Sequence, residues 1–253
     1  LENGAGYAII DDKNYYVPGK TILVDNVLTT LQKLASFHRK KFGLPILAIT
    51  GSNGKTTTKE LVAAVLSQKF NISFTKGNLN NHIGVPLTLL DMNSTTDIGV
   101  VEMGANHPGE IDALCKIASP DYGIITNIGR AHLEGFGSFE GIKRTKSELY
   151  NYLEKKGGTI FYNSDDTILK ELAEKITNKL SYGITNSAIT GKPQHSKPFI
   201  KVKINLPDGE IEVKTQLTGI YNFYNIMAAV SVGSYFGVNP SQIKSALQNY
   251  IPE

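Results

Sequence analysis

The stretch ITGSNGKTTTKE, residues 49–60, constrains the possible fold more than any other part of the chain. It continues the short apolar run of residues 46–50 and leads into apolar residues at helical spacing between Leu61 and Leu66. This order predicts a strand, a tight loop and a helix in succession. A glycine-rich loop in that position directs backbone N–H groups and the positive end of a helix dipole at one point. The stretch therefore predicts a phosphate-binding site.

The spacing of this loop differs from that of the common nucleotide-binding loop, G-x-x-x-x-G-K-[ST]. The first glycine of that pattern would be residue 49, which is Ile49, and the loop starts instead at Gly51. In the shorter form Lys55 can still reach the β- and γ-phosphates, and the Thr56 hydroxyl can still coordinate Mg²⁺. The residues predicted to contact the nucleotide in this loop are Gly51, Ser52, Asn53, Gly54, Lys55, Thr56 and Thr57.

The rest of the chain predicts an α/β fold with a mostly parallel sheet. Residues 97–105, 121–129 and 158–163 are apolar runs typical of buried strands, and helical patterns separate them. Strands that alternate with helices form a parallel sheet covered by helices on both faces, as in P-loop ATPases. Residues 198–217 alternate apolar and polar side chains about a Pro-Asp-Gly turn. This pattern predicts a small antiparallel hairpin added to the sheet.

Composition restricts the class of protein. With 41% hydrophobic and 19% charged residues, the 253-residue chain has the balance of a globular protein with a sizeable core. The net charge of +3 gives no reason to expect a nucleic acid or a membrane as a partner. No uncharged run approaches the roughly 18 residues of a membrane span. A single cysteine, Cys115, excludes internal disulfides and suits a reducing cytosol. We expect a cytoplasmic monomer.

Polar residues follow two further predicted strands. Glu102 lies at the carboxyl end of one apolar run, and Asn127 and His132 follow the next. Because the carboxyl ends of strands in an open α/β sheet form the usual ligand site, Glu102 is predicted to complete a Mg²⁺ shell beside Thr56. His132 lies in a polar loop after a strand end, which favours a functional role over a structural one.

Other polar residues leave a functional and a structural interpretation open. Asn80 and Asn81 belong to a group of three asparagines that would by default cap turns. Asn222 and Asn225 lie three residues apart on one predicted helix face, where they would bind a base or cap the helix. Lys146 lies on another predicted helix, and composition alone favours a solvated surface lysine.

Five stretches together resemble the Mur ligases of peptidoglycan synthesis, and within them the MurF subfamily most closely. In the family's order, between residues 45 and 250, these are TGSNGKTTTKEL, KGNLNNHIGVPLTLL, VEMGANHPGEI, TNIGRAHLEGFGS and GIYNFYNIMAA. The resemblance implies a ligase that uses ATP and Mg²⁺ to join D-alanyl-D-alanine to UDP-N-acetylmuramoyl-tripeptide. The γ-phosphoryl group would activate the substrate carboxylate as an acyl phosphate, which the amino group of the dipeptide attacks.

The resemblance also implies a catalytic and metal-binding set. Lys55 would bind the transferring phosphate, and Thr56 with Glu102 would hold a first Mg²⁺. His132 would bind a second Mg²⁺, with Lys146 as the lysine that the family carbamylates. A carbamate reverses the charge of the ammonium and so allows a role beside a metal. This implication replaces the interpretation of Lys146 as a surface residue.

For the organic ligands the resemblance implies two groups of contacts. One group lies around the adenine and the other near the muramoyl-peptide substrate: Asn127, Asn222 and Asn225 in the first, Asn80, Asn81 and His107 in the second. Many relatives carry His before the first asparagine of the helix motif, whereas this chain carries Tyr221. The contact to the base is therefore expected to differ in detail.

The domain organisation of the family predicts how the chain is divided. Residues 1–44 are predicted to be the end of the N-terminal UDP-substrate domain plus a linker helix, and residues 45–253 the central ATP-binding domain. The C-terminal domain, which contacts the incoming amine and closes over ATP, is expected to be absent. The chain is therefore expected to bind ATP weakly and to be inactive as a ligase alone.

Three alternatives stay open. A folylpolyglutamate-synthase-like ligase shares this type of loop and a carbamylated lysine, but its loop tends to continue K-G-S, where this chain has K-T-T. A regulatory GTPase commonly recognises guanine with N-K-x-D, and the nearest string, NKLS at residues 178–181, lacks the aspartate. A non-catalytic nucleotide-binding fragment is compatible with a truncated chain.

Overall fold

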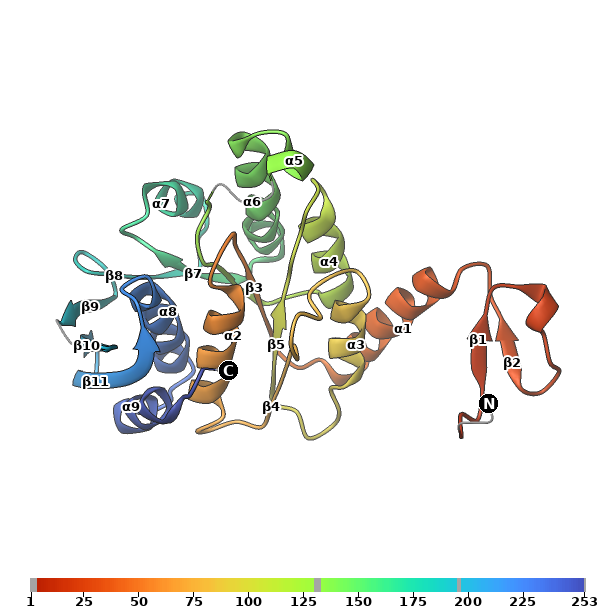
Figure 1. Ribbon diagram of the computed structural model, residues 1–253, viewed down its shortest axis with the longest axis horizontal. Helices are drawn as coiled ribbons and strands as arrows, with labels where there is room; N and C mark the ends of the chain where they lie inside the picture. The colour runs from red at the N-terminus through yellow and green to blue at the C-terminus, as the bar shows by residue number, and fades with distance from the viewer. Residues whose placement is uncertain (1–3, 130–132, 195–196, 253) are drawn as a thin grey trace.

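The computed structural model describes residues 4–129, 133–194 and 197–252, and Figure 1 shows their arrangement. The strands are β1 Ala8–Ile10, β2 Thr21–Leu23, β3 Ile46–Thr50, β4 Ile72–Phe74, β5 Ile98–Glu102, β6 Tyr122–Ile125, β7 Thr159–Asn163, β8 Lys179–Gly183, β9 Ile189–Gln194, β10 Phe199–Leu206 and β11 Gly209–Thr218. The helices are α1 Val27–Phe42, α2 Lys55–Leu66, α3 Gly84–Leu90, α4 Glu110–Ala118, α5 Leu133–Phe136, α6 Phe139–Lys156, α7 Thr167–Ala173, α8 Asn222–Tyr235 and α9 Pro240–Asn249, with a 3-10 turn at Lys13–Tyr15.

One large sheet organises the structure, with the strand order β11-β10-β9-β8-β7-β6-β3-β5-β4. From β4 to β9 neighbouring strands run parallel, whereas β10 is antiparallel to both β9 and β11. A tight turn joins β10 to β11 and places Leu206 opposite Gly209. The predicted α/β fold, with a mostly parallel sheet and an antiparallel hairpin addition, is confirmed.

Helices cover both faces of the sheet because the side chains of its strands alternate between two cores. In β3, Leu47 and Ile49 belong to a core shared with α2, α8 and α9, and Ile46 and Ala48 belong to a core shared with α1, α3, α4, α6 and α7. Successive side chains of a strand point to opposite faces, so a fully apolar strand supplies both cores at once.

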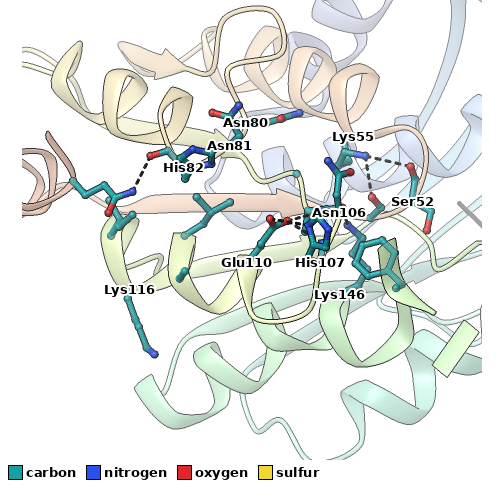
Figure 2. Close-up of a pocket in the computed structure, with 18 residues that line it drawn as sticks. Ser52, Lys55, Asn80, Asn81, His82, Asn106, His107, Glu110, Lys116 and Lys146 are labelled. Atoms are coloured by element: carbon teal, nitrogen blue, oxygen red, sulfur yellow. Dashed lines mark hydrogen bonds and ion pairs between the residues drawn. The ribbon is translucent and has the colours of Figure 1, made fainter. Parts of the chain in front are cut away.

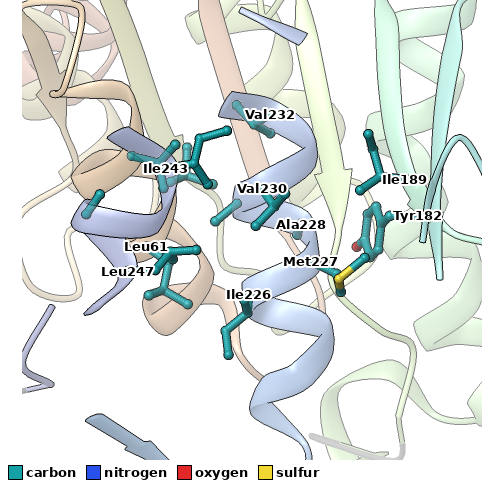
Figure 3. Close-up of a cluster of buried hydrophobic side chains, with 14 of the residues drawn as sticks. Leu61, Tyr182, Ile189, Ile226, Met227, Ala228, Val230, Val232, Ile243 and Leu247 are labelled. Atoms are coloured by element: carbon teal, nitrogen blue, oxygen red, sulfur yellow. The ribbon is translucent and has the colours of Figure 1, made fainter. Parts of the chain in front are cut away.

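Helix α8 lies at the centre of the first core. Figure 3 shows its side chains, among them Ile226, between Leu61 of α2, Ile243 of α9 and Tyr182 of β8. A helix that is hydrophobic on all sides has to be covered on all sides. The amino end of α8 is thereby held against α2, the helix that follows the predicted phosphate-binding loop.

Helix α1 connects the small β1–β2 pair to the sheet, and Figure 1 shows that pair apart from the other strands. The helix is fixed by Arg39, whose side chain is 8% exposed. Its guanidinium lies 2.8 Å from the Asp121 carboxylate and donates to the carbonyl of Ala118. Asp121 also accepts the N–H of Ile46 at 3.0 Å. The helix ends at Gly43, which has φ 63 in the left-handed region that glycine favours.

In the described ranges, none of the helices combines the length and the hydrophobicity that a membrane crossing requires.

Candidate functional site

Residues 51–54 form a loop at the carboxyl end of β3, where the connections of neighbouring strands diverge. Strand β3 leads into α2 on one face of the sheet, and the adjacent β5 leads into α4 on the other face. A crevice at such a reversal is the usual ligand site of open α/β sheets. Gly54, with φ 77, directly precedes Lys55, the first residue of α2. The N–H groups of the loop therefore lie at the positive end of the α2 dipole.

Hydrogen bonds fix this loop to the end of β6. The Thr126 hydroxyl donates to the carbonyl of Asn53 at 2.6 Å. The Asn127 amide donates to the same carbonyl at 2.9 Å and accepts the N–H of Asn53 at 3.1 Å. The Ser52 hydroxyl donates to the carbonyl of Gly129 at 3.0 Å and accepts its N–H at 2.9 Å. The shape of the loop is thus set by contacts within the protein.

Two features of the loop depend on Gly51 and Lys55. Gly51 has φ 143, and a Cβ added there would overlap the Thr126 hydroxyl and lie 3.1 Å from the Thr126 nitrogen. The Lys55 ammonium donates to the carbonyls of Gly51 and Ser52 at 3.0 and 3.2 Å. Burial lowers the pKa of Lys55, and the charge of Glu102 opposes that shift. The Lys55 ammonium therefore lies beside the loop, where it can contact phosphate oxygens.

The Glu102 carboxylate ends β5 beside α2 and is 1% exposed. Its Oε1 accepts the Asn80 amide at 2.8 Å and lies 3.4 Å from the Thr56 hydroxyl. Its Oε2 is a buried side-chain oxygen for which the described part of the chain supplies no hydrogen-bond partner. The Lys59 ammonium lies 3.7 Å from Oε2. A hydroxyl and a carboxylate with a free lone pair suit a hard divalent cation.

Lys146 comes to this crevice from α6 and is 3% exposed. Its ammonium lies 3.5 Å from the carbonyl of Ala105 and 5.6 Å from the centre of the Phe136 ring. Burial, aided by the positive charge of Lys55, lowers the pKa of Lys146 to about 8, and Glu110 is among the carboxylates that oppose the shift. The interpretation of Lys146 as a solvated surface lysine, which composition alone favours, is wrong.

A cavity of about 650 Å³ extends from Lys55 and Lys146 past α4 to residues 80–82, which precede α3. Figure 2 shows His107 and Glu110 close to these lysines and His82 farther along the cavity. The imidazole Nδ1 of His107 lies 3.4 Å from Glu110 Oε1. Burial would raise the pKa of Glu110, but hydrogen bonds from the backbone N–H groups of Asn106 and His107 lower it.

The two asparagines predicted near the substrate differ in their contacts, although both line this cavity. Asn80 binds Glu102, as described above. The Asn81 Oδ1 accepts the N–H groups of Ile83 and Gly84 at 3.0 and 2.9 Å, which caps the start of α3. The turn-capping interpretation that the sequence leaves open therefore describes Asn81.

The asparagine pair of α8 is buried against the loop. The Asn225 amide donates to Asn222 Oδ1 at 2.8 Å, and Asn225 Oδ1 accepts the Thr58 hydroxyl at 3.1 Å. A Cβ on Gly54 would lie 2.7 Å from the same oxygen. Asn222 donates to the carbonyl of Thr218 at 2.8 Å. The pair joins α8 to α2 at the loop, and its contact with a base stays a prediction.

His132, predicted as a metal ligand, lies outside the described residues. Within the described residues, no group of three or more His, Cys, Asp or Glu side chains could hold a metal ion. Two residues that sequence reasoning missed border the site, Lys59 and Phe136. Lys59 is three residues before Val62 and seven before Leu66, both buried. A charged residue on the apolar stripe of α2 was the signal that would have found it.

Comparison with known proteins assigns the family. The family described as the Mur ligase middle domain matches residues 49–233. The UDP-N-acetylmuramoyl-tripeptide–D-alanyl-D-alanine ligase of Bacillus subtilis is 39% identical over 226 residues, which are 89% of this chain and 49% of that protein. A crystal structure of MurF from Acinetobacter baumannii has a TM-score of 0.90 at 32% identity, covering 100% of this chain and 56% of that chain.

A MurF ligase from Thermotoga maritima, solved in complex with ADP, has a TM-score of 0.86 at 31% identity and covers 100% of this chain and 58% of that chain. The chain spans about half the length of the curated relatives it matches. The family match covers most of the chain and includes the loop at 51–54, the carboxylate of Glu102 and the lysine of α6. The chain belongs to the Mur ligase family and contains its middle domain.

Proposed function

We propose that this chain is the nucleotide-binding part of a ligase that forms an amide bond at the expense of ATP in peptidoglycan precursor synthesis. In the complete protein the substrates are UDP-N-acetylmuramoyl-tripeptide and D-alanyl-D-alanine. Residues 45–253 form the ATP-binding domain, and residues 1–44 form the end of a UDP-substrate domain with its linker. The observation that carries the proposal is that the loop residues Gly51, Ser52 and Lys55 line one cavity together with Lys146. The Thr56–Glu102 pair adjoins that cavity through Asn80, which lines it and binds Glu102.

The phosphates of ATP bind to the loop. The N–H groups of Ser52 and Asn53 donate to Asn127, so the N–H groups at the amino end of α2 and the α2 dipole face the β- and γ-phosphates. Lys55 places a positive charge where negative charge accumulates during phosphoryl transfer. The contacts of Ser52 and Asn53 with the end of β6 hold this cradle in shape. Asn127, Asn222 and Asn225 lie behind the loop and support the adenine end of the nucleotide.

The Thr56 hydroxyl and the Glu102 carboxylate, whose Oε2 has a free lone pair in the described part of the chain, would hold a Mg²⁺ ion. The chemistry that such an ion would supply is neutralisation of the phosphate charge, which favours attack on the γ-phosphorus. The backbone of Glu102 is fixed by the Thr75 hydroxyl, which accepts its N–H at 3.0 Å. His132 and Lys146 are the proposed ligands of a second Mg²⁺.

Lys146 has the surroundings that carbamylation requires. A carbamate forms when a neutral amine attacks carbon dioxide, making an N–C bond and releasing a proton. Because burial beside Lys55 lowers the pKa of Lys146 to about 8, a larger share of its amine is neutral near physiological pH than in a solvated lysine. The resulting anion would pair with Lys55 and with a metal ion, which removes the repulsion between the two ammonium groups.

The reaction proceeds in two displacements. The substrate carboxylate attacks the γ-phosphorus, an O–P bond forms, and ADP leaves with the electrons of the broken bond. The amine of the dipeptide then attacks the acyl carbon, phosphate leaves, and the nitrogen loses a proton. The cavity beside Lys55 and Lys146 is large enough to hold the reacting end of a peptide, with Asn80, Asn81 and His107 in its lining.

The test is calorimetric titration of the chain with a non-hydrolysable ATP analogue and Mg²⁺. We expect weak binding that falls at least about tenfold in Lys55→Met, because one charge-assisted contact to phosphate is lost. The matched control is Lys76→Met, because the Lys76 side chain is 74% exposed and its ammonium pairs with Asp91. Equal binding of a GTP analogue would favour the nucleotide-switch alternative.

Ligase activity is tested separately by product formation from the two amide-forming substrates. We expect no product from this chain alone, because it spans about half the length of the curated ligases that it matches. Product formed by the isolated chain would contradict that expectation. Turnover with a folate in place of the muramoyl peptide would support the folylpolyglutamate-synthase-like alternative.

A further inference from the structure

A buried lysine lies beside the candidate metal site without a role in the proposed reaction. Lys59 follows Thr56 by one turn of α2 and is 1% exposed. Its ammonium donates to the carbonyl of Gly77 at 3.2 Å and lies 3.7 Å from Glu102 Oε2 and 3.8 Å from Glu60 Oε1. A lysine is rarely buried unless its charge is paired, so this position needs an explanation.

The two oxygens of Glu102 have different surroundings. Oε1 is held by Asn80 and lies near the Thr56 hydroxyl. Oε2 lacks a hydrogen-bond partner within the described residues and faces the charge of Lys59 at 3.7 Å, too far for a hydrogen bond. The ammonium thus compensates the charge of Oε2 but leaves its lone pairs unused, which is the state a carboxylate needs in order to bind a metal.

We propose that the Lys59 ammonium substitutes for the divalent cation at Glu102 and thereby keeps the metal affinity of the nucleotide-free site low. The inference rests on the proposed function, because it takes the Mg²⁺ site at Thr56 and Glu102 as given. A Mg²⁺–oxygen bond of about 2.1 Å to Oε2 would place the metal within roughly 6 Å of the ammonium. At that distance the two cations repel each other strongly in a buried site.

Nucleotide phosphates change this balance, because they add negative charge on the metal side. Lys59 also has a second anion within reach. Lys59 and Glu60 both line a separate cavity of about 450 Å³, so the ammonium has room to shift from Glu102 towards Glu60. Metal binding is thereby linked to nucleotide binding, and free Mg²⁺ binds only weakly to the site when no nucleotide is present.

The decisive variant is Lys59→Met, examined in the absence of nucleotide. Without Mg²⁺ we expect a lower midpoint of thermal unfolding than in the unsubstituted chain, because Glu102 loses its counter-charge. Added Mg²⁺ should raise that midpoint, whereas it should leave the midpoint of the unsubstituted chain nearly unchanged. Binding of Mn²⁺, followed by electron paramagnetic resonance of the free ion, should tighten at least about tenfold.

Two controls separate this role from a merely structural ion pair. Lys76→Met makes the same change at an exposed lysine that lines the same second cavity, and should leave Mn²⁺ binding unchanged. The double variant Lys59→Met/Glu102→Gln should recover much of the midpoint, since the buried carboxylate at residue 102 is no longer charged, and should lose the Mn²⁺ gain. If Lys59→Met does not fold, Lys59→Gln serves instead, because its amide can still donate to the Gly77 carbonyl.

A lower midpoint in Lys59→Met with no gain in Mn²⁺ binding would overturn the proposal and leave Lys59 as a structural ion pair. The outcome is distinguishable from failure of the proposed function, because no nucleotide enters this experiment. A chain that gains Mn²⁺ binding in Lys59→Met but never binds ATP would refute the proposed function and retain the metal substitution.

Discussion

Replacing Gly51 with alanine tests whether the close approach of the loop to β6 is what requires a glycine. A non-glycine residue at φ 143 costs about 1–3 kcal/mol in backbone strain. The added Cβ would also displace the Thr126 hydroxyl, which donates to the Asn53 carbonyl at 2.6 Å, at a further cost of about 1–2 kcal/mol. We therefore expect Gly51→Ala to lower the free energy of unfolding by roughly 2–5 kcal/mol.

The chain offers a matched control for this change. Gly209, the first residue of β11, has φ 129 and open space around the position of a Cβ. Gly209→Ala therefore introduces the backbone strain of a positive φ but no overlap with another atom. It should lower the free energy of unfolding by only about 1–3 kcal/mol. Urea unfolding measures both variants, and titration with the ATP analogue should show weaker binding in Gly51→Ala alone. Equal unfolding midpoints and unchanged affinity in the two variants would refute the reasoning.

Substitution of two buried basic residues, Arg39 and Lys146, should change the stability of the fold in opposite directions. Arg39→Met leaves Asp121 without the guanidinium at 2.8 Å and should cost about 2–3 kcal/mol in urea unfolding, against little change for the exposed Arg144→Met. The folded-state pKa of Lys146, about 8, lies below the ordinary 10.5, so its burial destabilises the fold below pH 8 and ceases to do so as pH rises from 8 to 10.5. Lys146→Met should therefore be more stable at pH 7, by on the order of 3 kcal/mol at most, and this gain should shrink by pH 10. An equal gain in stability at pH 7 and at pH 10 would contradict the lowered pKa of Lys146. With carbon-13 bicarbonate, a carbamate resonance should appear in the unsubstituted chain and be absent from this variant.

Local patterns predicted the elements that carry a strong apolar signal. The strand, loop and helix around Gly51 and the hairpin at Gly209 were predicted correctly, because apolar runs end at glycines whose conformations turn the chain. Helix α3 was missed, since Gly84 and Pro86 within it resemble a loop and packing against α1 decides its form. Strands β4 and β8 were missed because one has three residues and the other, Lys179–Gly183, has no apolar run.

The site was harder to predict than the fold, because its charges are arranged by long-range topology. Local reasoning assigned Lys146 to the surface, and only the packing of α6 against α4 and β6 buries it. Lys59 escaped notice for the same reason, since its partner Glu102 is 43 residues away in the sequence. Spacing identifies a loop that binds phosphate, but it does not show which lysine neutralises which carboxylate.

The hydrogen bonds between the loop and the end of β6 have a consequence for the thermodynamics and rate of ligand binding. Ordering a backbone residue costs about 1–2 kcal/mol in conformational entropy, so the three residues 51–53 would require roughly 3–6 kcal/mol if a nucleotide had to order them. Here the hydrogen bonds to Thr126, Asn127 and Gly129 order the loop when the protein folds, so the nucleotide does not have to order it. A nucleotide therefore binds to a preformed loop, and we expect its association rate to be high. Differences in affinity among nucleotides should appear mainly in their dissociation rates.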